Sequence, residues 1–530
     1  MSSSKADSAP VSAKPEDWSA EIAELRARQT AAKEMGGADK VQIQRDKGKW
    51  TVRERIDALL DQGSFRELGS ITGRAEYGPN GELNDFTPAN CVMGRGRIDG
   101  RPVVVAGDDF TVRGGAADAS IADKQIQAEQ MAHELRLPIV RLIDGSGGGG
   151  SVKSLEMNPC TYVPAIPGWN WVTANMTTVP VVSLGLGPIA GLGAARLVSG
   201  HYTLLLRETG FMFAAGPAVV SALGRPVTKE DLGGAMVHAR SGAVDDIAED
   251  ETDAMAKARR FLSYLPSSVD GLPERGEQTD PVDRQDAWLD GAIPHDRRKP
   301  YDMRKIVNAV VDQGSFMEIG RYWGKASITG LARLDGWPVA VVASDPKIYA
   351  GGWTHDTAQK LTRFMEMAET FHLPVVHLVD IPGVLIGIEA EKFGTIRHAA
   401  RGLATVFQAS VPWCTVIVRK AFGVAGAAMS NHTRFRYRYA WPSGDWGSLP
   451  IEGGIEAAYK AQLEAAEDPV ALRAEIEARL NAVRSPFRTA ERYGVEEIIA
   501  PRETRPLLCE FANLAAPLRK PGPSSFGFRP

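Results

Sequence analysis

The sequence carries the same arrangement twice, and this internal duplication constrains the fold more than any other feature. The pentapeptide Asp-Gln-Gly-Ser-Phe occurs at residues 61–65 and again at residues 312–316. The segments that begin at Gly96 and Leu137 are each answered 236 residues later. A repeat this long is typical of duplicated domains and not of a solenoid. We therefore expect two similar domains facing each other, with a site between them.

Length and composition agree with a globular protein of two domains. At 530 residues the chain exceeds what one core usually supports, and two domains of about 200 to 250 residues would account for it. Hydrophobic residues make up 44% and charged residues 24%, which argues against general disorder. The net charge of −4 offers no basic field, so no nucleic-acid binding is expected. With no secretory leader and no long apolar run, we expect a soluble, cytoplasmic protein without membrane spans.

The cysteines predict neither a metal site nor a disulfide framework. The four cysteines lie far apart, without a Cys-x-x-Cys pair or a histidine at metal-ligand spacing. Free, buried thiols are the expected state.

Composition along the chain suggests five regions. Residues 1–17 are expected to form a disordered tail, and residues 18–265 the first domain. Residues 266–299 contain Pro, Gly and many charges without a period, as linkers do. Residues 300–519 form the second domain, in which a long charged helix is expected near its end. Residues 520–530 are rich in Pro, Gly and Ser, and this tail is expected to dock on a neighbouring subunit or to stay loose.

Each copy predicts the same α/β unit. In the first copy two short strands flank the turn at Asp99, residues 119–135 are helical, and residues 138–143 form an apolar strand. The second copy repeats this order between residues 330 and 379. Ahead of the first unit, residues 51–60 predict a helix that opens with a capping box. The expected fold class is therefore α/β, with largely buried strands in both halves.

Each half also places a turn rich in glycine and alanine between an apolar strand and a helical stretch. The first turn covers residues 185–194 and the second residues 420–428. Small residues let a ligand approach the backbone, and amides at the start of a helix suit a developing oxyanion. Tight helix-to-strand packing explains either turn alone equally well. Their recurrence at matching positions favours two anion sites.

Other polar residues predict no protein-supplied nucleophile or base. The glycine cluster at residues 144–151 follows a buried strand, where a ligand-binding loop is expected in an open α/β sheet. Asp108, Asp109 and Asp144 are interpreted as turn formers, and Lys420 as a solvated or phosphate-facing cation. No Gly-x-Ser-x-Gly elbow or His-Glu-x-x-His motif is present. The pattern indicates oxyanion chemistry with an externally supplied base.

At these residues the chain resembles the carboxyltransferase (β) subunits of biotin-dependent acyl-CoA carboxylases, of the propionyl-CoA and acetyl-CoA carboxylase type. The resemblance runs from about Ile22 to about Leu508. It implies two tandem crotonase-like domains related by duplication, in a homo-hexamer built as a trimer of dimers. The motifs that carry it are residues 50–57, 94–100, 109–115, 216–217, 232–235, 262–266 and 419–423.

The resemblance also implies site residues and a mechanism. Acyl-CoA would bind the first domain, with oxyanion amides at Gly191 and Leu192, and biotin the second, with amides at Val424 and Ala425. Carboxybiotin would release CO2, the biotin anion would take the α-proton of the thioester, and the enolate would attack CO2. The further contacts implied are Gly147, Gly148, Gly149, Ala190, Gly423 and Ala427 for substrate, and Gly383, Val384 and Leu385 for biotin.

The chain has no Met-Lys-Met biotinylation motif and no ATP-binding region, so biotin is expected on a separate carrier, with a biotin carboxylase as a further partner. Two alternatives stay open: a biotin-dependent CoA-ester decarboxylase subunit, and a noncatalytic assembly subunit of the same fold.

Several residues depart from the pattern of the family. Leu192 and Val424 stand where many relatives have glycine, and Ala427 where short-chain carboxylases carry aspartate. The glycine loop lacks the family's arginine, and Trp169 and Trp171 lie in an unusual segment. These departures predict an unusual acyl group, larger or branched.

Overall fold

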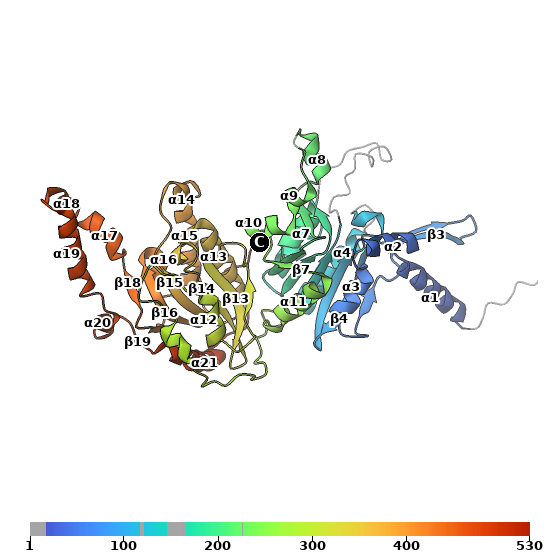
Figure 1. The fold of residues 1–530 in the computed structure, drawn as a ribbon. Helices are drawn as coiled ribbons and strands as arrows, with labels where there is room; N and C mark the ends of the chain where they lie inside the picture. Colours follow the sequence, from blue (N-terminus) through green and yellow to red (C-terminus); the bar gives the residue numbers. More distant parts are fainter. Residues whose placement is uncertain (1–16, 117–120, 146–162, 164, 225) are drawn as a thin grey trace, which may run out of the picture.

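The computed structural model describes residues 17–116, 121–145, 163, 165–224 and 226–530. Two α/β halves lie side by side, the first coloured blue to green and the second yellow to red (Figure 1). Within the described residues, each half is built on one large twisted sheet.

The first sheet has the strand order β1-β4-β5-β6-β7-β9-β11. The pairs β1–β4 and β4–β5 are antiparallel, and all later pairs are parallel. Five consecutive residues of β6 are buried, as expected of a strand covered on both faces. The strands are β1 (Arg66–Leu68), β4 (Cys91–Ile98), β5 (Arg101–Asp108), β6 (Ile139–Ile143), β7 (Val181–Gly185), β9 (Tyr202–Leu206) and β11 (Asp246–Ala248), with a separate hairpin of β2 (Gly73–Tyr77) and β3 (Leu83–Pro88).

The second sheet repeats this order as β12-β13-β14-β15-β16-β17-β19. Its first two pairs are again antiparallel and the rest parallel. The duplication predicted from sequence is thus confirmed strand by strand. The strands are β12 (Met317–Ile319), β13 (Ser327–Leu334), β14 (Trp337–Ser344), β15 (Val375–Ile381), β16 (Trp413–Phe422), β17 (Tyr437–Ala440), β18 (Asp445–Gly447) and β19 (Glu497–Ile498).

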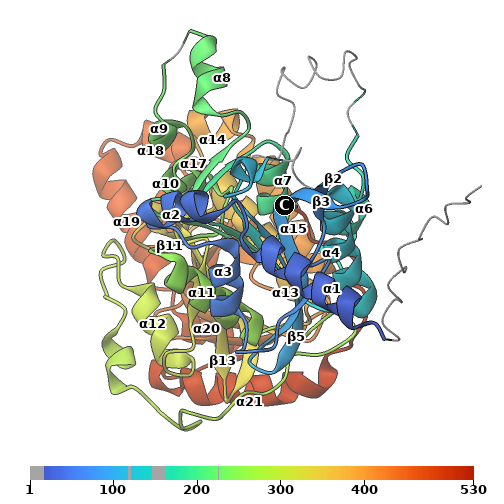
Figure 2. The same ribbon diagram turned by 90° about the vertical axis from the view of Figure 1, so that its right-hand side faces the viewer.

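Helices cover both sheets, and α8 projects from the body in both views (Figures 1 and 2). The first half contains α1 (Ser19–Lys33), α2 (Ala38–Asp46), α3 (Val52–Leu59), α4 (Ala122–Leu135), α6 (Trp169–Asn175), α7 (Leu192–Val198), α8 (Pro217–Ala222), α9 (Lys229–Gly233), α10 (Ala235–Ser241) and α11 (Glu251–Ser263). The second contains α12 (Met303–Val310), α13 (His355–Thr370), α14 (Ile388–Lys392), α15 (Thr395–Gln408), α16 (Gly423–Ala427), α17 (Ile451–Ala458), α18 (Lys460–Ala465), α19 (Pro469–Asn481), α20 (Pro486–Ala490) and α21 (Thr504–Ala515).

Local sequence signals account for where several helices begin and end. The capping box is confirmed at α3, where Thr51 and Glu54 each bond the other's backbone N–H. The charged region predicted to be helical at residues 455–480 is helical, but it is divided among α17, α18 and α19 and does not form one long helix. Asp468 caps α19 and Pro469 occupies its first position, which favours a new start over continuation.

The halves are joined through one hydrophobic core. Helix α13 is buried on most of its sides, and the core cluster to which it belongs runs from Val52 in the first half to Phe528 near the chain end. Arg363 of α13 pairs with Asp245 of the first half at 3.1 Å. Separation of the halves would therefore expose apolar surface and an ion pair.

The C-terminal tail closes this junction. The alternative that residues 520–530 stay loose is wrong, because the tail packs on its own chain; docking on a neighbouring subunit stays a prediction. Phe528 is only 2% exposed, with its ring 4.4 Å from that of His201, and the Arg363 guanidinium lies 4.6 Å from its ring centroid. Burial of this apolar ring at the junction stabilises the folded chain, because it removes apolar surface from water. Figure 1 shows the chain end between the two halves.

Candidate functional site

In each half a short pair of parallel strands is followed by a glycine whose φ is positive, in the left-handed region. In the first half β8 (Pro188–Ala190) pairs with β10 (Phe211–Phe213), and Gly191 follows with φ 59°. In the second half the end of β16 pairs with β18, and Gly423 follows with φ 61°. Only glycine adopts this conformation without strain, so the glycine content of both turns has a conformational cause.

The strand pairs set a residue-by-residue correspondence between the turns. Gly191 matches Gly423, and Leu192 therefore matches Val424, 232 residues later. The predicted amide pairs, Gly191 with Leu192 and Val424 with Ala425, are one position out of step. The Gly191 N–H donates to Phe213 O at 3.1 Å, so the fold already uses it. Leu192 and Gly193 open α7, where the first amides have no acceptor inside the helix.

Both turns lie at the surface of the chain. The Val424 side chain is 49% exposed, and Gly191 is exposed. Ala190 and Gly423 are partly buried, whereas Ala425 is buried. Ala427 is exposed, and its carbonyl accepts a bond from the His432 ring at 2.8 Å.

The two loops predicted beside the turns differ in what can be described. Gly147, Gly148 and Gly149 lie outside the described residues. In the second half Val384 forms a parallel bridge with Trp353, whose N–H donates to Gly383 O at 3.0 Å. Leu385 N–H donates to Trp353 O at 2.8 Å. This loop is therefore fixed by backbone hydrogen bonds to Trp353.

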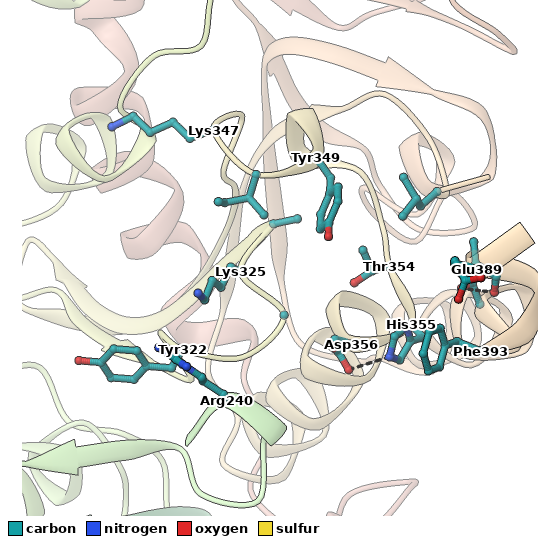
Figure 3. Close-up of a pocket in the computed structure, with 16 residues that line it drawn as sticks. Arg240, Tyr322, Lys325, Lys347, Tyr349, Thr354, His355, Asp356, Glu389 and Phe393 are labelled. Atoms are coloured by element: carbon teal, nitrogen blue, oxygen red, sulfur yellow. Dashed lines mark hydrogen bonds and ion pairs between the residues drawn. The ribbon is translucent and has the colours of Figure 1, made fainter. Parts of the chain in front are cut away.

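Two cavities flank the loop at residues 383–385. One, of about 920 Å³, borders Pro382 and Phe422, and cations are prominent in its wall. The other, of about 670 Å³, lies where Tyr349 and Phe393 of the second half approach Arg240 of the first (Figure 3). The cations of the larger cavity are Arg297, Arg298, Arg419, Lys420, Arg473 and Arg484.

Two buried aspartates beneath the turns were not recognised from the sequence. Asp144 is fully buried and pairs with Lys49 at 2.6 Å and Arg55 at 2.8 Å. Asp380 is also fully buried and pairs with Arg419 at 3.0 Å. The interpretation of Asp144 as a turn former is wrong, because its carboxylate is enclosed by cations. The signal available was its recurrence 236 residues later, after an equally apolar strand.

The neighbouring pair of aspartates divides between two roles. Asp109 accepts bonds from the N–H and hydroxyl of Thr111, so its prediction as a turn former is confirmed. Asp108 lies 3.7 Å from Arg196 and accepts the N–H of Asp144, so it is not a turn former. Burial raises the pKa of both Asp108 and Asp109, and it lowers the pKa of Lys49.

The described residues also show the state of three cysteines. Cys91, Cys414 and Cys509 are buried and free, as predicted, and Cys160 lies outside the described residues. Among the side chains that the structure describes, no group of three or more His, Cys, Asp or Glu could hold a metal ion. No helix in the described ranges is long and apolar enough to cross a membrane.

Comparison with known proteins decides the family. The model of the carboxyl transferase domain matches residues 43–521. The chain belongs to the carboxyl transferase family. It is 34% identical over 510 residues to the carboxyltransferase subunit of propionyl-CoA carboxylase from Haloferax mediterranei, covering 95% of this chain and 97% of that one.

Two further relatives are named for other activities. The α subunit of methylmalonyl-CoA decarboxylase from Veillonella parvula is 33% identical over 501 residues, covering 93% of this chain and 95% of that one. The hexameric transcarboxylase 12S, solved with methylmalonyl-coenzyme A, superposes with a TM-score of 0.85 at 30% identity, covering 99% of this chain and all of that one. The predicted pair of crotonase-like domains and the enzyme class, an acyl-CoA carboxyltransferase, are confirmed by these likenesses.

Proposed function

We propose that this carboxyl transferase is the carboxyltransferase subunit of a biotin-dependent acyl-CoA carboxylase. The carboxyl group moves from carboxybiotin to the α or vinylogous carbon of an acyl-CoA through a thioester enolate. The observation that carries the proposal is the matched pair of left-handed glycine turns, at Gly191 and Gly423, in a chain of this family. One turn per half suits a reaction with two carbonyl groups to polarise, a thioester and a ureido group.

The two halves take different ligands in this proposal. The first half binds acyl-CoA, and the amides of Leu192 and Gly193 at the start of α7 hold the thioester oxyanion, in a turn that Gly191 shapes. The second half binds biotin, with amides of the turn at Val424 and Ala425. Six cations and three carboxylates, those of Asp296, Asp445 and Glu477, line the larger cavity, and this excess of positive charge supports an anionic ligand on that side.

The biotin site fits the residues present. Biotin supplies the transferred carboxyl group and the base, which accords with the absence of a catalytic base motif in the sequence. Gly383, Val384 and Leu385 are fixed by Trp353. In this proposal they would orient biotin against the turn. Substitution of glycine by Leu192 and Val424 leaves both backbone amides in place.

The assembly follows from the same proposal. Biotin arrives on a separate carrier that works with a biotin carboxylase in the cytoplasm. The chain forms a homo-hexamer, a trimer of dimers, in which the first half faces the second half of a partner. The full-length likeness to hexameric transcarboxylase 12S supports this assembly.

A decarboxylase is the second candidate, because the Veillonella parvula relative covers nearly the whole chain. Both directions use the same turns. The coupled subunits set the direction, so assay of the assembled complex separates the two: ATP-dependent carboxylation of acyl-CoA identifies a carboxylase, and CO2 release from a carboxylated acyl-CoA without ATP identifies a decarboxylase.

We infer that the preferred acyl group is larger or more branched than propionyl. The changes at Leu192 and in the segment of Trp169 and Trp171 support this. A panel of acyl-CoAs, assayed with the native carrier and carboxylase, tests it. The highest kcat/KM for acetyl-CoA or propionyl-CoA would refute it.

The oxyanion assignment is tested at Leu192. Gly191 cannot be replaced by proline because its φ is 59°, whereas Leu192 opens α7, where proline is tolerated. Leu192→Pro removes one amide donor, and we expect kcat to fall by about 10²- to 10³-fold. Leu192→Ala keeps the amide and should keep most of the turnover. Equal turnover in Leu192→Pro and Leu192→Ala would refute the assignment.

A further inference from the structure

A fully buried carboxylate lies directly beneath each glycine turn. In the second half it belongs to Asp380, near the end of β15. The Lys420 N–H donates to this carboxylate at 3.0 Å. Lys420 lies on the part of β16 that pairs with β18, three residues before Gly423. The carboxylate is therefore bonded to the backbone that leads into the turn.

Two side chains hold the Asp380 carboxylate in place. The Arg419 guanidinium lies 3.0 Å away, and the Tyr301 hydroxyl donates to it at 2.9 Å. The same guanidinium lies 4.7 Å from the Tyr301 ring centroid, so these side chains also hold each other. A carboxylate buried this deeply is stable only with such partners.

In the first half the buried carboxylate is also linked to the backbone ahead of the turn, but through different residues. The position that matches Lys420 is Pro188, which has no N–H to donate. Here Asp144 contacts the backbone through cations: Arg55 bonds Asp144 at 2.8 Å and also donates to Leu186 O at 3.1 Å. Leu186 lies in the connection from β7 to β8, just ahead of the turn.

The cation beside the carboxylate comes from a different segment in each half. Arg419 is matched in the first half by Gly187, where an added Cβ would lie 2.0 Å from the Asp144 carboxylate and 2.5 Å from the Lys49 ammonium. The missing side chain leaves the room that Lys49 fills from another segment. Because the residues differ and the ion pair persists, the pair itself is the common requirement.

We propose that Asp144 and Asp380 are positioning residues, which set the glycine turns in the geometry that transfer requires. The ion pairs hold Leu186 and residues 419–420, and Gly191 and Gly423 lie three to five residues further along the chain. The inference rests on the proposed function, since it assumes that these turns bind the reacting carbonyls. Loss of either carboxylate shifts the turn amides without removing them.

The test compares Asp380→Asn and Asp144→Asn with a matched control. Asp312→Asn removes another buried carboxylate that accepts backbone N–H bonds, from Asp335 and Gly336, and pairs with Arg505 at 2.9 Å. Asp312 lies at the hairpin between β13 and β14, at the other end of the sheet from the turn. All three variants lose stability, so melting temperature alone does not distinguish them.

Steady-state kinetics with free carboxybiotin and acyl-CoA make the distinction. We expect Asp380→Asn and Asp144→Asn to lower kcat by about 10- to 100-fold, with the KM for acyl-CoA nearly unchanged. Asp312→Asn should keep the kcat of the unmodified chain at temperatures where it is folded. A folded Asp380→Asn or Asp144→Asn with unchanged kcat, or an equal fall in Asp312→Asn, would overturn the inference.

Two additions keep the outcome decisive. If Asp380→Asn does not fold, Tyr301→Phe removes one donor to the same carboxylate with little change of volume, and a lower kcat at unchanged KM is again expected; unchanged kcat counts against the inference. Leu192→Pro separates the two hypotheses. A loss of turnover there, without loss in the aspartate variants, refutes the positioning role alone. Full turnover in Leu192→Pro refutes the oxyanion assignment, and no transfer by the unmodified chain to any acyl-CoA refutes the proposed function itself.

Discussion

His201 shows how a single side chain can be committed to one protonation state. Its Nδ1 accepts the Val181 N–H at 3.1 Å, and its Nε2 donates to Met176 O at 2.9 Å. The ring lies 4.7 Å from that of Phe371, across the junction of the halves. Complete burial lowers the pKa of His201 to about 3, so the imidazole is neutral in the folded chain.

This state predicts how stability depends on pH. The unfolded chain protonates His201 near its ordinary pKa of about 6.5, whereas the folded chain resists protonation down to about 3. The stabilisation is complete above pH 6.5 and declines as the pH falls, by about 2 kcal/mol at pH 5. His201→Asn keeps an acceptor for Val181 and does not titrate. Urea unfolding should therefore give a flatter profile for this variant between pH 6.5 and 4; an unchanged slope would contradict the assignment.

At the level of elements, the same left-handed turn occurs in both halves. It follows β5 in the first half and β14 in the second. In the second half Tyr349 has φ 46°, Ala350 φ 52° and Gly351 φ 87°. In the first half Arg113, Gly114 and Gly115 have φ values from 52° to 67°. Gly351 lies against the backbone of Asp380, where an added Cβ would meet its carbonyl oxygen at 2.2 Å.

Adjacent positions of this turn should respond oppositely to small changes. Gly351→Ala forces a contact with the Asp380 backbone and adds left-handed strain, so we expect a loss of more than about 3 kcal/mol. Ala350→Gly relieves the strain at φ 52° and raises the entropy of the unfolded chain, so the change should stay within about 1 kcal/mol. Urea midpoints of both variants provide the measurement. Equal effects would show that the turn does not have this geometry.

Elements with a clear hydrophobic pattern, a local capping signal or a copy in the other half were predictable from the sequence. The strand at residues 138–143 is observed as Ile139–Ile143, and the capping box at Thr51 is present. The glycine turns were located, but the Gly191 N–H bond to Phe213 was not, because β10 comes only after α7 and β9. The environment of Asp144 was missed for the same reason: Lys49 is 95 residues distant in sequence.

For the whole molecule, the junction of the halves is the feature that sequence patterns predicted least. The repeat predicted two domains, and they are present. Nothing local indicated that α13 would be enclosed by both halves, or that Phe528 would return to their junction. Such contacts join residues that are hundreds of positions apart in the sequence, so no local hydrophobic pattern indicates them.

The tail should contribute strongly to global stability. Phe528→Ala removes a buried ring from the junction, and we expect a loss of about 3 to 5 kcal/mol in the free energy of unfolding. Leu518→Ala, at a side chain 65% exposed, is the control and should change stability by less than about 0.5 kcal/mol. Calorimetry and urea unfolding measure both. Similar values for the two variants would show that the tail does not hold the junction.

The shared core also bears on the history of the chain. Duplicated domains that had stayed independent would each bury their own surface and could be expressed separately. Here α13 and Phe528 contribute to a core that neither half completes alone. A gene cut between the copies should therefore yield two insoluble fragments, which regain solubility when produced together. Each copy has thus become part of the other's hydrophobic core.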